Sequence, residues 1–345
     1  MKLIHTYVPT RVGSEINKIT LQNMILSVLC AKVHFNSISL YTDETTSQIV
    51  KKIGIPYDEI ITEPFINFES NTFSIPKLIT YSLQDESFIH IDIDTFIYKR
   101  IEVSDTIPYF YAHPDIDMST ISNFQMSLNL YQTYLKNAHM IKNRIPEDIK
   151  KYINFNDIPN MNVFGTIKPE IVSESAKICL KIYNDNREFF DSEYYNACII
   201  EQLLIPSVIK KLNETHYENH YLIESKNVFR IETNDVDLES IELPFNISFD
   251  GNIIGIDNEF SLFQLVNYDY RTIVHLGGYK NLDIFQFLVR ETILDRFNGI
   301  EYIIKLDKLF VEPIPGQEIS DKFYNHMLNK TANKISKLRT KKNII

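Results

Sequence analysis

Residues 88–94 form an apolar run that ends in two carboxylates separated by one residue, Phe88-Ile89-His90-Ile91-Asp92-Ile93-Asp94. Side chains two positions apart on an extended segment point to the same side of it. We therefore expect the Asp92 and Asp94 carboxylates to converge on one hard cation. Open α/β sheets bind their ligands at the carboxyl ends of the strands, where this pair would lie. The run predicts a buried strand that leads into a metal-dependent site.

Two further Asp-x-Asp triplets occur in the chain. Asp115-Ile116-Asp117 follows a proline and precedes Ser119 and Thr120, which predicts a loop with helix-capping groups. Asp235-Val236-Asp237 lies in a polar stretch and predicts a turn. Only Asp92-Ile93-Asp94 follows a convincing core strand, although a strand-end pair that merely caps the next turn remains the structural alternative.

The pattern around residues 88–94 alternates strands with helices. We expect strands at 3–8, 37–41, 59–61 and 88–93, and helices at 14–31, 46–53 and from Pro76 onward. This order predicts an α/β fold, a mostly parallel sheet flanked by helices. Further helices are expected at 122–138, 169–183, 193–205 and 282–294, and strands at 229–232, 245–249 and 273–276. One domain over residues 1–300 and a C-terminal helical, basic tail over 301–345 are predicted.

Composition and charge exclude several classes of function. The net charge of −10 and the pI near 5.4 argue against nonspecific nucleic-acid binding. Only 9 glycines are present, without a GxGxxG or Walker A pattern, which excludes the common phosphate loops. Cys30, Cys179 and Cys198 each fall in an apolar stretch and predict reduced core thiols. No apolar run approaches the roughly 18 residues that span a bilayer, so we expect a soluble, cytoplasmic protein.

A second signal is the segment His275-Leu276-Gly277-Gly278-Tyr279-Lys280, which follows the apolar pair Ile273-Val274. A histidine at a strand end can complete an oxygen-rich metal site. The glycines let the backbone approach a phosphate, and the lysine can place a point charge on it. A satisfied turn histidine beside a tight Gly-Gly turn is the alternative.

A third signal combines the segment Asn160-Met161-Asn162-Val163-Phe164-Gly165 with Glu201-Gln202 inside an apolar helix. Amide and carboxylate groups in a cleft suit sugar hydroxyls, which need donors and acceptors together. Burying an acidic group without a partner is costly, which indicates a site at Glu201. The alternative places Glu201 and Gln202 on the solvated side of the helix.

The last twenty residues predict an amphipathic helix with one apolar face and one basic face. Met327, Leu328, Ile335 and Leu338 follow helical spacing, and lysines 330, 334, 337 and 341 trace another face. Such a helix on an acidic protein can touch anionic lipid, which predicts a peripheral membrane contact. A solvated and partly frayed tail is the alternative.

These motifs together resemble the GT-A glycosyltransferases with a DXD motif, most closely the retaining family-eight type and its bacterial relatives. The similarity rests on a strand ending in Asp-x-Asp, an Asn-x-(Gly/Asn)-x-x-Gly segment, an acidic-Gln pair on a helix and a late His-x-x-Gly with Lys. It spans about residues 1 to 285, with Thr42-Asp43 and Lys77 in similar places. The resemblance implies a GT-A fold and transfer of a sugar from a nucleoside-diphosphate sugar.

The resemblance also implies site residues. Asp92, Asp94 and His275 would bind Mn²⁺ or Mg²⁺, and Lys280 with Gly278 would contact the diphosphate. Thr6 and Tyr7 would meet the base and ribose, and Lys77 would join the donor site. Asn160 would approach the sugar, and Gln202 would lie beside the reacting carbon, with Glu201 next to it. The chain departs from the family in three places: Lys280 follows His275 by five residues instead of six, Glu201 replaces Asp, and Asn162 replaces Gly.

The sequence therefore predicts a metal-dependent glycosyltransferase that acts on an acceptor hydroxyl of a glycan or a lipid-linked glycan. If the reaction inverts the anomeric carbon, Glu201 is the first candidate for the base. Two alternatives stay open: a non-catalytic nucleotide- or glycan-binding protein with this fold, and a related nucleotidyltransferase. The missing Gly-rich loop after the first strand argues against the nucleotidyltransferase.

Overall fold

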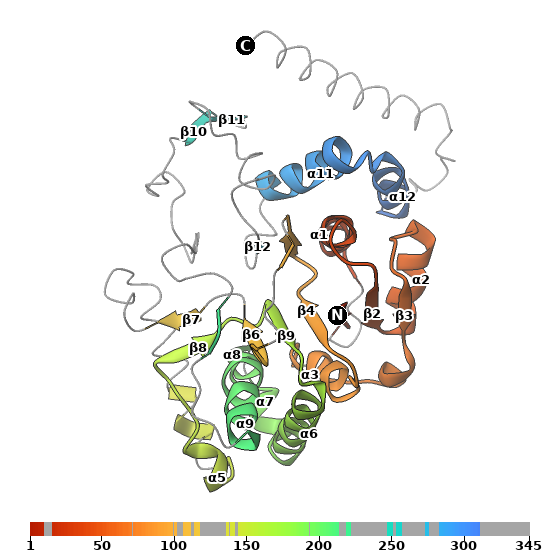
Figure 1. Cartoon of the computed structure of the whole chain (residues 1–345). Coiled ribbons are helices and arrows are strands. Elements are labelled where there is room, and N and C mark those ends of the chain that lie inside the picture. The colour runs from red at the N-terminus through yellow and green to blue at the C-terminus, as the bar shows by residue number, and fades with distance from the viewer. Residues whose placement is uncertain are drawn as a thin grey trace.

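A six-stranded sheet forms the centre of the molecule, in the order β3-β2-β1-β4-β9-β6 (Figure 1). The computed structural model describes residues 1–9, 16–70, 72–98, 100–101, 106–111, 114–117, 136–137, 139–141, 144–192, 194–213, 219–221, 247–250, 253–256, 273–275 and 283–310. Three of the pairings are parallel: β3 (Glu59–Ile61) with β2 (Ile38–Thr42), β2 with β1 (Lys2–Tyr7), and β1 with β4 (Phe88–Ile91). The strand β9 (Val163–Thr166) runs antiparallel to β4 and to β6 (Tyr109–Tyr111). The expected mostly parallel sheet is confirmed.

Helices cover both faces of the sheet, because strand side chains alternate between two apolar cores. Leu3 and Ile89 face one core, and their neighbours Ile4 and Phe88 face the other. The first core is closed by α1 (Lys18–Lys32), α2 (Glu44–Ile53), α11 (Asp283–Phe297) and α12 (Ile300–Phe310) (Figure 1). The second is closed by α3 (Ile75–Ser82), α6 (Pro169–Asp185), the π-helix η3 (Ile199–Leu204) and α9 (Ile205–Leu212).

Shorter elements complete the described fold. Three strand pairs lie outside the main sheet: β5 (Thr95–Ile97) with β12 (Ile273–His275), β7 (Pro114–Asp117) with β8 (Asp157–Pro159), and β10 (Ile247–Asp250) with β11 (Ile253–Ile256). The short helices are η1 (Glu63–Phe65), α5 (Glu147–Lys150), α7 (Arg187–Phe190) and α8 (Tyr194–Cys198).

Local chemistry explains where the first helices begin. The Asn17 side chain accepts a hydrogen bond from Thr20 N at 2.8 Å, so α1 begins at Lys18 instead of residue 14. Asp43 caps α2 by accepting from Thr46 N at 3.0 Å, and Gly54 ends that helix at a φ of 82°. Pro76 lies in the first turn of α3, as expected.

Several predictions require correction. The Asp115-Ile116-Asp117 triplet is not a loop, since it belongs to β7 and pairs with β8. The helix predicted over 193–205, to be stopped or bent by Pro206, does not stop there: it widens into η3 and continues as α9. The predicted domain boundary at residue 301 stays a prediction; α12 begins at Ile300, and its Ile303 and Leu306 are buried in the first core.

Other predictions lie outside the described residues. These are the Asp235-Val236-Asp237 turn, the strand at 229–232, most of the helix at 122–138 and the basic segment at 327–341. Cys30 and Cys179 are buried free thiols, and Cys198 is half-buried.

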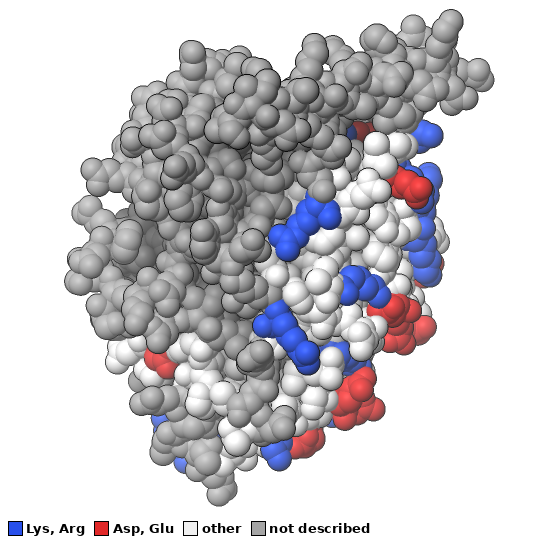
Figure 2. Space-filling view, turned by 45° about the horizontal axis from the view of Figure 1, so that its top comes forward, with Lys and Arg blue, Asp and Glu red and all other residues white. Residues whose placement is uncertain are grey.

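On the face shown in Figure 2, basic and acidic side chains are interspersed along the described surface. Some of the surface charges form ion pairs, such as Lys32–Asp58 and Lys2–Glu86. None of the described helices has both the length and the apolar character needed to cross a bilayer.

Candidate functional site

The site lies where the strand order of the sheet reverses. The chain places β2 and β3 on one side of β1 and then returns to place β4 on the other side. In open α/β sheets, ligands bind at such a switch point, outside the carboxyl ends of the strands. Tyr7 ends β1 and Asp92 follows β4, so both lie at this edge. The antiparallel β9 starts here as well, because Asp92 N donates to the Asn162 carbonyl oxygen at 2.9 Å.

The two aspartates belong to a turn. β4 ends at Ile91, and Thr95 N donates to the Asp92 carbonyl oxygen at 3.0 Å. This corrects the expectation of an extended Asp92-Ile93-Asp94 segment, so alternation along a strand does not orient the two carboxylates. The Asp92 side chain is 23% exposed, whereas Asp94 is 4% exposed.

The turn leads directly into β5, which brings a distant segment to the site. β5 pairs with β12 in antiparallel register, and His275 lies opposite Thr95, the residue after Asp94. The backbones of the three predicted metal ligands are therefore neighbours. Carboxylate oxygens suit Mn²⁺ or Mg²⁺. The described side chains form no group of three or more His, Cys, Asp or Glu suited to a metal ion, so the metal stays a prediction.

Lys77 occupies the centre of the charged groups on the second-core face. Its Nζ lies 2.6 Å from Asp92 Oδ1 and 2.7 Å from Glu201 Oε1. Lys77 is only 9% exposed and Glu201 only 3%. Burial opposes protonation of Lys77, but the charges of Asp92 and Glu201 outweigh it and hold the pKa of the ammonium well above its usual value. A charged triad thus lies between α3, η3 and the end of β4, with Lys77 and Glu201 buried and Asp92 partly exposed.

The helix that carries Glu201 changes its winding at this point. Residues 199–204 form a π-helix between α8 and α9, and Pro206 lies in the first turn of α9. Proline has no N–H to donate to the preceding turn, and single π-turns are frequent at functional sites. Glu201 faces the buried side, so the expected alternative of a solvated Glu201 is wrong, whereas Gln202 is half-buried.

The side chain of Thr6 is engaged within the protein. Thr6 Oγ1 donates to Thr80 Oγ1 at 3.0 Å and lies 3.2 Å from His90 Nε2. Tyr7 is half-buried against the first core, and its carbonyl oxygen accepts from Thr42 Oγ1 at 2.5 Å. Contact of Thr6 and Tyr7 with a nucleotide stays a prediction.

The remaining predicted residues separate into described and undescribed ones. The Asn160 side chain accepts from Asn162 N at 2.9 Å and shapes the entry to β9. Gly165, which ends the same motif, lies under the Phe110 ring. Gly278 and Lys280 lie outside the described residues.

Sequence reasoning missed Tyr81 and the side chain of Asn162. Tyr81 lies four residues after Lys77 on α3, a spacing that places both on one helix face. Burial raises the pKa of the Tyr81 hydroxyl well above its usual value, and the charge of Glu201 adds to this effect.

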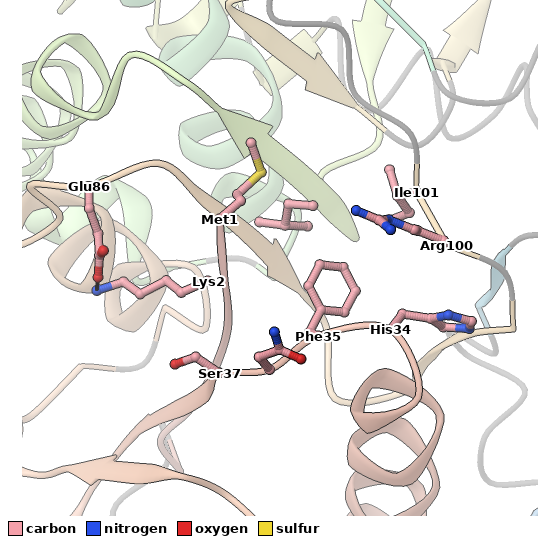
Figure 3. A pocket seen from close by; sticks show the side chains of 10 residues that line it. Met1, Lys2, His34, Phe35, Ser37, Glu86, Arg100 and Ile101 are labelled. Atoms are coloured by element: carbon pink, nitrogen blue, oxygen red, sulfur yellow. Dashed lines mark ion pairs between the residues drawn. The ribbon is translucent and has the colours of Figure 1, made fainter.

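A surface cavity of about 710 Å³ opens at the other edge of the sheet (Figure 3). Its lining includes Met1, Ser37 and Ile101, and Lys2 pairs with Glu86 there at 2.9 Å. Met1 and Lys2 lie at the amino end of β1, Ser37 precedes β2 and Glu86 precedes β4, and no predicted site residue lines the cavity. The cavity is therefore separate from the Asp92 site.

Residues 4–241 match the model of a family described as a family of unknown function, DUF6734. Among solved structures, the apo form of mouse xyloside xylosyltransferase 1 is similar over 64% of this chain and 77% of its own, with 10% identity and a TM-score of 0.26. A similarity this low establishes neither fold nor function. No curated protein matches the sequence significantly.

Proposed function

This chain belongs to DUF6734, a family of unknown function, and we propose that it is a metal-dependent glycosyltransferase of the GT-A type. It would move a sugar from a nucleoside-diphosphate sugar to an acceptor hydroxyl. The observation that supports this proposal best is the meeting of Asp92, Lys77 and Glu201 at the switch point of the sheet. The neighbouring elements α3 and β4 and the distant η3, whose Glu201 lies 124 positions from Lys77, place opposite charges there, at the edge where α/β proteins bind their ligands.

Each predicted residue then has a chemical task. Asp92, Asp94 and His275 would hold Mn²⁺ or Mg²⁺, which when bound offsets the charge of the departing diphosphate. Lys77, Gly278 and Lys280 would bind the donor phosphates, and Thr6 and Tyr7 the base and ribose. Asn160 would orient the sugar, with Gln202 beside the reacting carbon.

The stereochemical outcome depends on Glu201. Its carboxylate is paired with the Lys77 ammonium, which stabilises the ionised form and fixes its position. Retention of configuration follows from the family resemblance. Inversion would instead require a base for the acceptor hydroxyl, and Glu201 is the candidate.

One observation favours a second candidate function. The Lys77 ammonium lies 2.6 Å from Asp92, where it would compete with a divalent cation for the same oxygen. A non-catalytic nucleotide- or glycan-binding protein would tolerate this arrangement, since it needs no metal.

The test combines binding with turnover. Thermal shift is measured with nucleoside diphosphates and their sugar conjugates, with and without Mn²⁺, and release of nucleoside diphosphate is then assayed. A ligand at 100 times its Kd adds roughly 2.7 kcal/mol of stability. We expect Mn²⁺-dependent release that Asp94→Asn abolishes and that Asp115→Asn, in the triplet of β7, leaves unchanged. Binding without turnover supports the second candidate, and absence of both from the folded protein overturns both.

The acceptor would be a glycan or a lipid-linked glycan. The basic segment at 327–341 would hold the protein against an anionic membrane. We expect salt-sensitive binding to phosphatidylserine vesicles that truncation after Phe323 removes. Equal vesicle binding by the full and truncated chains would refute the membrane contact.

A further inference from the structure

Asn162 lies directly opposite Asp92 across the junction of β4 and β9. The ladder pairs Ile91 with Val163, and the hydrogen bond from Asp92 N to the Asn162 carbonyl oxygen extends it by one pair. Side chains directly opposite in an antiparallel pair have Cβ atoms roughly 4.5–5.5 Å apart, so we expect the side chains of Asn162 and Asp92 to start from neighbouring points.

Asn162 immediately precedes β9, and continuing the alternation of that strand by one residue places it on the face of the sheet that carries the charged triad. Phe164 packs in the second core and Val163 in the first, so position 162 shares the face of Phe164. Asp92 meets Lys77 of α3 on that same face. Asn162 therefore belongs with Asp92, Lys77 and Glu201.

The Asn162 amide is buried but unpaired. The residue is 2% exposed, yet neither its Oδ1 nor its Nδ2 has a hydrogen-bond partner among the described residues. The Tyr81 hydroxyl, on the same side of the sheet, also has no hydrogen-bond partner among the described residues. The charges of Glu201, Lys77 and Asp92 all act on this hydroxyl. Leaving such groups unsatisfied is unfavourable, and a ligand with matching groups would recover that loss.

We propose that Asn162 is a specificity-determining residue that reads a hydroxyl pair of the transferred sugar, with the Tyr81 hydroxyl as a second contact. This inference rests on the proposed function. An amide offers one acceptor and one donor group on the same plane, which matches adjacent hydroxyls of a sugar ring. The GT-A pattern that the sequence resembles has glycine at this position, so the recognition would rest on the Asn162 side chain of this chain.

The experiment compares each sugar nucleotide with its own nucleoside diphosphate. Calorimetric Kd values are measured in Mn²⁺ for UDP against UDP-glucose and UDP-galactose, and for GDP against GDP-mannose. In Asn162→Ala we expect about a tenfold loss of affinity for the preferred sugar nucleotide. Affinity for the nucleoside diphosphate alone should stay within about twofold, because the amide meets only the sugar.

Stability of the ligand-free protein separates recognition from a structural role. Removing an unpaired amide should leave the melting temperature of Asn162→Ala unchanged or raise it. Asn213→Ala is the matched control. The Asn213 amide donates to Tyr109 Oη at 3.1 Å, so its removal should lower the melting temperature. Asn162→Ser, with a smaller polar side chain, provides a second variant.

The possible results fall into three groups: they support the inference, overturn it alone, or overturn the proposed function as well. A Kd loss confined to the sugar nucleotide supports the inference. Equal losses for sugar nucleotide and diphosphate, no loss in either variant, or destabilisation equal to that of Asn213→Ala overturns it while the proposed function stands. If wild type binds no sugar nucleotide and no nucleoside diphosphate, the proposed function falls and takes the inference with it.

Discussion

Lys77 and Glu201 are joined by a buried salt bridge of 2.7 Å although 124 positions separate them in the chain. The pair connects α3 to η3 across the second core. It also holds the Lys77 ammonium against Asp92, so that helix packing and the charge of the site depend on one side chain. Breaking a buried ion pair on one side leaves its partner uncompensated in a poorly solvated place.

We expect Lys77→Met to lower the free energy of unfolding by about 3 kcal/mol at pH 7, since it leaves Glu201 buried without a counter-charge. Urea denaturation measures the change. The control is Lys32→Met, which breaks the more exposed Lys32–Asp58 pair and should cost less than about 1 kcal/mol. Equal losses in the two variants would contradict the prediction, and Lys77→Met/Glu201→Gln should recover part of the loss.

A second prediction concerns a buried chain of hydrogen bonds behind the Asp92–Asp94 turn. Ser27 Oγ donates to the Thr95 carbonyl oxygen at 2.6 Å, so it accepts from His5 Nε2, 3.2 Å away. We expect Ser27→Ala to lose roughly 1–3 kcal/mol, because both partners are left unpaired. Ser47→Ala is the control, since the buried Ser47 hydroxyl has no partner among the described residues. If Ser27→Ala and Ser47→Ala show the same stability by denaturation, the hydrogen bonds of Ser27 do not anchor the turn.

Stability should fall as the pH drops below about 6.5, because His5 and His90 are buried as neutral rings. Burial lowers the pKa of His5 to about 3 and that of His90 well below its usual value. The unfolded chain binds these protons below about 6.5 and the folded chain does not, so each histidine removes roughly 1 kcal/mol per pH unit. Carboxylates add to the loss only below about pH 4.5.

Denaturation of wild type, His5→Gln and His90→Gln between pH 7 and 5 measures this slope. Each single variant should show about half the wild-type slope, since one of the two titrating rings is gone. A slope that is the same in all three proteins would assign the acid sensitivity to other groups.

Gly165→Ala should destabilise the fold. A Cβ at this position would lie 1.9 Å from Phe110 Cζ, inside the ring that covers the glycine. Overpacking of this kind costs roughly 1–3 kcal/mol. Thermal denaturation should show that Phe110→Leu relieves part of the loss in the double variant. A strictly additive double-mutant cycle would mean that ring and methyl group do not meet.

Local sequence signals predicted the elements well. The strand at 59–61 and the proline at the start of α3 agree with the structure, because apolar alternation and helix-start chemistry act over a few residues. The same kind of signal predicted the start of α1 at residue 14, whereas the Asn17 cap begins that helix at Lys18, and it missed that Asp115-Ile116-Asp117 pairs with β8. A strand pairing depends on a partner forty residues away, which local pattern does not contain.

The candidate site also has some features that follow from local sequence and others that depend on long-range packing. The sequence by itself determined that a buried strand ends at two aspartates, that His275 ends a later strand and that Glu201 is an acidic residue in an apolar helix. Only the tertiary structure decided that the aspartates form a turn and that Lys77 neutralises Glu201. It also decided that the Asn162 side-chain amide has no hydrogen-bond partner among the described residues. Strand and helix preferences are set by neighbours in the chain, whereas the charge and hydrogen bonding of a buried group are set by whatever segments the fold packs around it.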